Sequence, residues 1–167
     1  MSLRAPGDPF PQLTITAPDV DPLLVSDILA DRFGILLFYR GSWCPYCQTQ
    51  LRGFQRAQAT LTELGAETVA VSVDDEATTR ETISKHGLTF LVGHSADADM
   101  LAAATGAFVN PEPRYVQSTG FVLDPSGAVI VSVYSSGAIG RLVAEDVVGL
   151  IRYIKEHPAA ELRPKAG

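Results

Sequence analysis

The chain has 167 residues, of which 46% are hydrophobic and 19% charged, and its formal net charge is −6. This composition excludes a disordered chain and fits one compact domain, and an acidic chain without a basic run is not expected to bind nucleic acid. No segment approaches the roughly 20 apolar residues of a membrane span, and the first residues lack the apolar core of a signal peptide. With two cysteines and no leader, we expect a cytoplasmic protein without membrane partners.

The first half of the chain predicts alternating strands and helices. The run from Phe33 to Tyr39 is continuously apolar, which indicates a central strand with both faces covered. Between residues 47 and 64 apolar side chains recur at helical spacing, and Gly65 is expected to end this helix. The other expected elements are a proline-rich lead-in at 6–11, a strand at 13–16, a short helix or turn at 21–31 capped by Ser26, and a second buried strand at 67–73.

The second half continues the alternation and closes with a hairpin and a helix. Asp74 and Asp75 are expected to cap a helix that runs to about His86. The segment 124–127, Asp-Pro-Ser-Gly, predicts a type I turn between two antiparallel strands. The remaining elements are a strand at 89–92, a short helix at 97–105, the hairpin strands at 121–124 and 129–134, a final helix at 143–157 and a frayed tail after about 158.

This element order predicts a mixed sheet between layers of helices, an α/β fold. Parallel strands are expected where a helix connects them, and antiparallel strands in the late hairpin. No internal repeat or linker divides the sequence. Residues 1–167 are therefore expected to form a single domain with a short N-terminal lead-in.

Cys44 and Cys47 are the only cysteines, and they flank Pro45 and Tyr46 at the predicted junction of strand and helix. A C-x-x-C pair at such a junction is typical of a thiol–disulfide site. Unpaired N–H groups and the helix dipole stabilise a thiolate at the helix start, where proline is also well accommodated. We therefore predict that Cys44 is the nucleophile and the more exposed sulfur. Cys47, one turn along, is the predicted resolving thiol, close enough to form a disulfide without loss of the first helical turn.

Two cysteines at this spacing are also half of a zinc site. Its other ligands would come from His86, His94 and His157, which are scattered singly. Neither a second C-x-x-C nor an H-x3–5-H pair is found. An inert apolar pair would not require cysteine at a helix start. The pattern therefore favours redox chemistry, and no metal or other cofactor is predicted.

Several short segments match a known family in order and spacing. They are Phe38-Tyr39, 70–75 (Ala-Val-Ser-Val-Asp-Asp), 85–90 (Lys-His-Gly-Leu-Thr-Phe), 94–97 (His-Ser-Ala-Asp), 120–127 (Gly-Phe-Val-Leu-Asp-Pro-Ser-Gly) and Gly140-Arg141. Over roughly residues 8 to 157 the chain resembles the peroxiredoxin-like branch of the thioredoxin fold, the alkyl hydroperoxide reductase/thiol-specific antioxidant family. The resemblance implies a thioredoxin-like three-layer α/β/α sandwich with a mixed central sheet. It also implies a cofactor-free enzyme that takes electrons from thioredoxin, glutaredoxin or glutathione.

The chain departs from the family around its cysteines. The family pattern P-x-x-x-[TS]-x-x-C has Leu37 in place of its proline and Gly41 in place of its hydroxyl residue. The family arginine before the late strand is replaced by Ser118, whereas Arg141 matches a second family arginine. Arg40 is a further cation four residues before Cys44. Arg40 and Arg141 are therefore candidates to stabilise the thiolate, although surface cations more often pair with acidic residues.

Two other redox families match only in part. Phe38 stands where thioredoxins have a buried aspartate, and Ser118-Thr119 stands where they have Pro-Thr. The dipeptide Pro45-Tyr46 is the one found between glutaredoxin cysteines. Trp43 is a candidate both for a packing wall and for a flat surface that contacts the reductant. The residues expected to contact substrate or donor are Trp43, Pro45, Tyr46, Ser118 and Thr119.

Three functions remain open. In the first, Cys44 attacks a peroxide and becomes a sulfenic acid, which Cys47 converts to a disulfide. In the second, Cys44 attacks a protein or glutathione disulfide and Cys47 displaces the partner. In the third, the pair is a non-catalytic redox sensor. The family resemblance favours peroxide reduction with an external thiol donor, slow because the hydroxyl and one arginine are missing, and the oligomeric state stays open.

Overall fold

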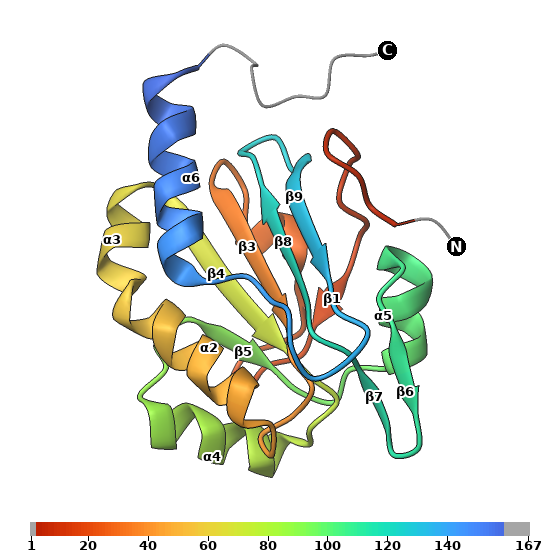
Figure 1. The fold of residues 1–167 in the computed structure, drawn as a ribbon. Coiled ribbons are helices and arrows are strands. Elements are labelled where there is room, and N and C mark those ends of the chain that lie inside the picture. Colours follow the sequence, from red (N-terminus) through yellow and green to blue (C-terminus); the bar gives the residue numbers. More distant parts are fainter. Residues whose placement is uncertain (1–2, 159–167) are drawn as a thin grey trace.

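Five strands form the central sheet, in the order β5–β4–β3–β8–β9 (Figure 1). The structure is a computed structural model that describes residues 3–158. The central strand β3 (Phe33–Phe38) runs parallel to β4 (Ala66–Val71) and antiparallel to β8 (Thr119–Leu123). Outside these, β5 (Leu91–Gly93) is parallel to β4 and β9 (Val129–Tyr134) is antiparallel to β8. The predicted mixed sheet is confirmed, and all six residues of β3 are buried.

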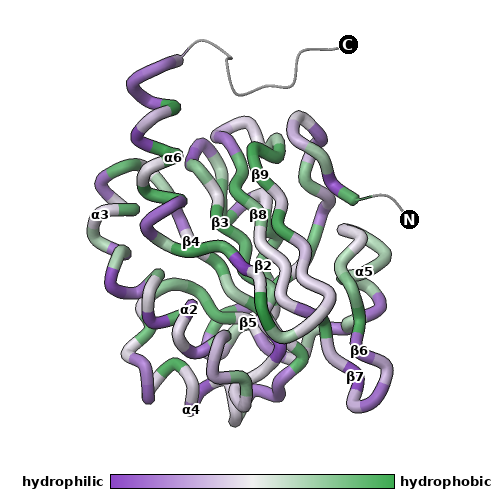
Figure 2. The backbone as a smooth tube through the Cα atoms, viewed as in Figure 1, coloured by the Kyte–Doolittle hydropathy of each residue, from purple (hydrophilic) through white to green (hydrophobic). Residues whose placement is uncertain are grey.

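Helices cover both faces of this sheet. The helices α2 (Pro45–Arg56), α3 (Gln58–Glu63) and α6 (Ala144–Glu156) pack on one face, and α1 (Val25–Ile28) and α5 (Ala98–Thr105) on the other (Figure 1). Each face has its own hydrophobic core, because alternate side chains of β3 point to opposite sides. Hydrophobic residues gather along β3 and β4, and hydrophilic ones on the outer helices and turns (Figure 2). The predicted three-layer α/β/α sandwich is confirmed.

The sheet order decides where the functional residues meet. Phe38 at the end of β3 pairs with Val71 on one side and with Thr119 on the other. The chain that leaves β3, the chain that leaves β4 and the chain that enters β8 therefore lie at one edge of the sheet. This is the edge where open α/β sheets commonly place their ligands.

Local capping signals gave correct helix starts. The helix α4 (Glu76–His86) begins after Asp75, whose carboxylate accepts the Thr78 N–H at 2.8 Å, and it ends at Gly87 in a left-handed conformation. Asp97 caps α5 in the same manner. In the late hairpin the N–H of Gly127 donates to the Asp124 carbonyl at 2.9 Å, which is the hydrogen bond of a β-turn at the predicted position. These elements depend on neighbouring residues, so the sequence predicts them well.

Three segments differ from the prediction. The helix predicted up to residue 64 begins at Pro45, as the cysteine motif indicates, but it is interrupted at Ala57 between α2 and α3. The region 21–31 holds a strand, β2 (Leu23–Leu24), paired with β1 (Thr14–Ile15), and the short α1 has no side-chain cap at Ser26. A hairpin of β6 (Val109–Pro111) and β7 (Arg114–Val116) was not predicted, because its prolines mask the strand pattern. The tail expected after 158 lies outside the described residues.

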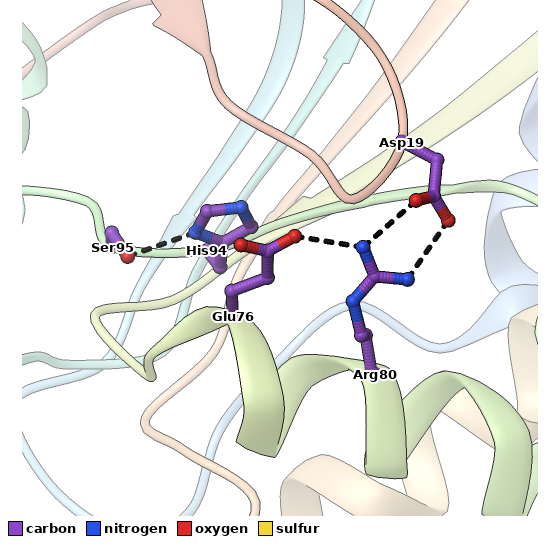
Figure 3. Close-up of polar contacts among 5 residues, drawn as sticks. All are labelled: Asp19, Glu76, Arg80, His94 and Ser95. Atoms are coloured by element: carbon purple, nitrogen blue, oxygen red, sulfur yellow. Dashed lines mark hydrogen bonds and ion pairs between the residues drawn. The ribbon is translucent and has the colours of Figure 1, made fainter.

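Polar contacts attach the N-terminal segment to α4 and to the chain that follows β5. Arg80 donates to both carboxylate oxygens of Asp19 and to Glu76, each at 2.8 Å (Figure 3). The backbone N–H of His94 donates to the Thr16 carbonyl at 2.8 Å, and its ring contacts Ser95. The ion pairs are exposed and are expected to contribute little to stability. Within residues 3–158, no helix has both the length and the apolar character that crossing a membrane requires.

Candidate active site

The C-x-x-C pair lies at the start of α2, which follows β3 in the chain after a short loop. Cys44 is the N-cap residue, with extended backbone, and Pro45 is the first helical residue. The Sγ of Cys44 accepts the backbone N–H of Cys47 at 3.3 Å. The sulfur therefore takes the place of the side-chain oxygen that usually satisfies a free N–H at a helix start. The helix begins where the cysteine spacing predicted, and both cysteines are free thiols.

Arg40 brings a positive charge to Cys44. Its Nη1 lies 3.8 Å from the Cys44 Sγ, and its Nη2 donates to the Tyr115 hydroxyl at 2.9 Å. The guanidinium also stacks over two rings, 4.9 Å from the centre of Trp43 and 5.3 Å from that of Tyr115. The two rings meet edge to face at 5.0 Å. One aromatic pair thus holds the cation against the sulfur.

Both cysteines are completely buried, with 0% of their surface exposed. The backbone N–H of Arg40 donates to the Cys47 Sγ at 3.4 Å, so the loop before α2 contacts both sulfurs. The prediction that Cys44 is the more exposed sulfur is therefore wrong. Arg40 lies against the Cys44 sulfur and stacks on the rings of Trp43 and Tyr115, and nothing local in the sequence predicts this cluster.

The two thiols differ in acidity. Burial alone would raise the pKa of Cys44, but hydrogen bonds from the thiol and backbone N–H of Cys47 and from Arg40, with the charge of Arg141, lower it below its usual value. Burial raises the pKa of Cys47 to about 12, helped by its hydrogen bond to Cys44. Cys44 is therefore the thiol that loses its proton first, and Cys47 is the one that keeps it.

Arg141 is the second cation that acts on the pair. Its Nε donates to the Ser118 hydroxyl at 3.1 Å, and its guanidinium lies 5.7 Å from the centre of the Tyr46 ring. Its charge lowers the pKa of both cysteine thiols. Arg40 and Arg141 thus act on the pair from two different segments, the loop after β3 and the loop before α6.

Ser118 and Thr119 are less available than predicted. Ser118 is buried and bound to Arg141, and Thr119 is buried with its hydroxyl donating to the Gln117 carbonyl at 3.0 Å. The contact of these two residues with a substrate or donor stays a prediction. Trp43 and Tyr46, by contrast, are 53% and 51% exposed and form the rim of the site.

The segment that carries Arg141 is held in place by two contacts. The amide of Gln50 on α2 donates to the Leu142 carbonyl at 3.0 Å. The Leu142 side chain packs onto Gly120 of β8, where an added Cβ would lie 2.6 Å from the leucine Cδ1. A larger residue at 120 would displace Leu142, and with it the neighbouring arginine.

Asp74 holds the loop before Cys44 and was missed as a site residue. Its carboxylate accepts the backbone N–H of Ser42 at 2.8 Å, and burial raises its pKa. The Gln48 amide donates to the carbonyl of the same serine. Of the two aspartates predicted to cap α4, only Asp75 accepts a backbone N–H of that helix. Asp74 follows β4, which runs parallel to β3, so the sequence could have placed it beside the loop before Cys44. No local feature of the sequence indicates that Tyr115 belongs to the site.

No metal cluster accompanies the pair in the described part of the chain. Across residues 3–158, no group of three or more His, Cys, Asp and Glu side chains could hold an ion. The three histidines considered as zinc ligands do not join the cysteines. The observed geometry is that of an activated thiol with an adjacent second thiol.

Known proteins resemble this chain in sequence and in fold. A family model described as AhpC/TSA family matches residues 6–132. A peroxiredoxin from Treponema denticola is 26% identical over 145 residues, which span 84% of this chain and 69% of that protein. The thiol-disulfide oxidoreductase ResA of Oceanobacillus iheyensis is 27% identical over 139 residues, 81% of this chain and 68% of the relative. The crystal structure of peroxidoxin BcpB from Mycobacterium tuberculosis superposes with a TM-score of 0.78 at 20% identity, covering 90% of this chain and 98% of that one, which shows the shared fold.

Proposed function

The chain belongs to the AhpC/TSA family of peroxiredoxin-like thiol oxidoreductases, and from that premise we propose that it reduces peroxides through the Cys44–Cys47 dithiol. Cys44 is the nucleophile and Cys47 the resolving thiol. An external thiol returns the pair to its reduced form. No prosthetic group takes part in the proposed cycle.

The proposed cycle has two oxidative steps. The Cys44 thiolate attacks the terminal oxygen of a peroxide ROOH, the O–O bond breaks, and RO⁻ leaves to take a proton as ROH. Cys44 is then a sulfenic acid. The Cys47 sulfur attacks the Cys44 sulfur, an S–S bond forms, and the sulfenic hydroxyl leaves with the Cys47 proton as water. The peroxide gains two electrons, and the two thiols lose them.

One observation carries this proposal: the Cys44 sulfur lies 3.8 Å from the Arg40 guanidinium and accepts the Cys47 N–H at 3.3 Å. These donors stabilise a thiolate, and the thiolate is the form that attacks peroxide. The same guanidinium is placed to stabilise negative charge that develops on the departing oxygen. Cys47 lies within the same helical turn, so the second step needs no distant thiol.

Thiol loss after mixing tests the proposal. Reduced protein is mixed with stoichiometric hydrogen peroxide or with oxidised glutathione, and free thiols are counted over time. We expect both thiols to disappear faster with peroxide than with oxidised glutathione. Rapid loss with oxidised glutathione and none with peroxide would contradict peroxide reduction.

A second candidate, thiol–disulfide exchange, has its own support. The ResA relative is named for that activity, and Gly41 leaves no hydroxyl three residues before Cys44. In this reaction Cys44 attacks a disulfide, forms a mixed disulfide, and Cys47 releases the partner. The mixing experiment separates the two reactions. If neither oxidant consumes the thiols quickly, the redox-sensor hypothesis gains support.

A further inference from the structure

A pocket of about 580 Å³ opens beside Tyr46, one of the two residues between the cysteines. It lies between α2 and the segment that runs from β9 into α6, where the two come together (Figure 1). Arg141, whose charge acts on both thiols, belongs to its wall. The volume falls within the usual range of sites for small ligands, roughly 300–1,000 Å³. The oxidative steps proposed above do not use this space.

The wall of the pocket combines charges of both signs with apolar surface. Arg141 and Arg56 are cationic, and Glu145 contributes a carboxylate from the first turn of α6. Among the ion pairs of residues 3–158, none involves these three side chains. Ile139 and Val143, 69% and 50% exposed, add apolar contact area.

Two buried polar atoms of residues that line the pocket lack partners. The Oε1 of Gln50 and the Nη2 of Arg141 are enclosed and make no hydrogen bond in the structure. Gln50 is 8% exposed, and its amide nitrogen is already bound to Leu142. The free oxygen requires a donor and the free guanidinium N–H requires an acceptor. A peptide that carries a carboxylate offers both, after a small rotation of the two side chains.

We propose that this pocket binds the electron donor, and that the donor is a small peptidic thiol with carboxylate groups. The proposal rests on the dithiol cycle above and adds the identity of its reductant class. Arg141 and Arg56 receive carboxylates, Glu145 an ammonium group, and Gln50 a peptide N–H. Tyr46 forms the boundary between the bound peptide and the cysteines, and glutathione is a ligand with all of these groups.

The reductive steps balance with two molecules of this thiol. The first thiolate attacks the Cys44 sulfur of the Cys44–Cys47 disulfide, the S–S bond breaks, and Cys47 leaves and takes a proton. A mixed disulfide between Cys44 and the donor remains. The second thiolate attacks the donor sulfur of this mixed disulfide, which yields the oxidised donor and the Cys44 thiolate. Two electrons pass from the donor to the protein.

A binding experiment with S-methylglutathione tests the pocket without any redox step. The probe has the charges and amides of glutathione but no free thiol. We expect it to bind the wild-type protein and to shift the NMR signals of Gly53 and Gly140. Arg56→Gln should weaken binding about tenfold through the loss of one charged contact. Arg52→Gln, the same change on the same helix outside the pocket, should leave binding unchanged.

A kinetic experiment connects the pocket to the cycle. The Cys44–Cys47 disulfide is prepared and reduced with glutathione or with uncharged dithiothreitol. The ratio of the glutathione rate to the dithiothreitol rate should fall about tenfold in Arg56→Gln, in line with the lost contact, and stay constant in Arg52→Gln.

Several outcomes overturn the proposal: no binding of S-methylglutathione, equal effects of the two arginine variants, or reduction by thioredoxin but not by glutathione. The last outcome would indicate a protein reductant. Binding of S-methylglutathione by a protein whose thiols do not react with peroxide would support the pocket and contradict the proposed function, so the two failures are distinguishable.

Discussion

Trp43 occupies a space that only glycine at position 41 leaves free. A Cβ at this position would collide with the indole Nε1 of Trp43. Position 41 lies three residues before Cys44, where the family pattern has threonine or serine. The same indole stacks on Arg40. Where the family pattern has a hydroxyl side chain, this chain therefore has the ring of Trp43, which holds Arg40 in place.

Gly41→Thr tests this exchange. The new side chain should displace Trp43 and lower the free energy of unfolding by about 1–3 kcal/mol, as overpacking commonly does. Because Arg40 loses its aromatic support, oxidation of Cys44 by peroxide should slow as well. Urea unfolding followed by the fluorescence of Trp43, the only tryptophan, measures the first effect. Ser42→Ala is the control, and equal results for the two variants would contradict the packing argument.

Arg40 is predicted to control the acidity of Cys44. Arg40→Met removes a positive charge next to the sulfur, so the pKa of Cys44 should rise and the fraction of thiolate at neutral pH should fall. The rate of alkylation by iodoacetamide near pH 7 should drop about tenfold. Arg52→Met removes the same charge from α2 away from the sulfur and serves as the control. An unchanged pH profile of alkylation in Arg40→Met would show that the hydrogen bonds from Cys47 suffice.

At the scale of elements, the first turn of α2 already contains the geometry of the oxidised state. Cys44 is the N-cap and Cys47 the third helical residue, joined by the 3.3 Å contact from the N–H to the sulfur. Closing a disulfide within one turn requires no distant segment to move. Hydrogen exchange over α2 should therefore agree within about twofold between the reduced and oxidised proteins. Rapid exchange across residues 45–52 after oxidation would mean that the helix start unfolds.

The elements that the sequence predicts well are those with local causes. Pro45 after a cysteine, Asp75 and Asp97 before helices, and the turn at 124–127 each act through residues within one turn. Tyr115 had no such signal. It reaches Arg40 only because an unpredicted hairpin, β6–β7, places it there across 75 residues of sequence.

At the scale of the molecule, the sheet order assembles the site. The carboxyl end of β3 lies between the end of β4 and the start of β8, which brings Arg40, Asp74 and Ser118 to one edge. The general architecture followed from the alternation of elements. The burial of Cys44 did not, because it depends on two segments far apart in the sequence, the loop after β3 with Arg40 and Trp43, and β7 with Tyr115.

The buried acids of this core predict a loss of stability at high pH. Burial raises the pKa of Cys47 to about 12 and that of Tyr39 to about 12. In the unfolded chain both groups lose their protons at lower pH, so the native state binds more protons above about pH 9. The free energy of unfolding of the reduced protein should therefore fall as the pH rises from about 9 towards 12.

Urea midpoints at about pH 8 and about pH 11 measure this loss. Cys47→Ser and Tyr39→Phe each remove one titrating group, so each should show a smaller decrease than the wild-type protein. If both variants lost as much stability as the wild-type protein, the pH dependence would have to come from other groups.

The most direct test of the central claim is the fate of Cys44 in the Cys47→Ser protein after stoichiometric hydrogen peroxide. Without its resolving thiol, Cys44 should accumulate as a sulfenic acid that dimedone traps and mass spectrometry locates at that residue. The wild-type protein should instead form the Cys44–Cys47 disulfide, and Cys44→Ser should not react. Absence of a trapped sulfenic acid at Cys44, or turnover of peroxide by Cys44→Ser at a rate comparable to the wild type, would contradict the account.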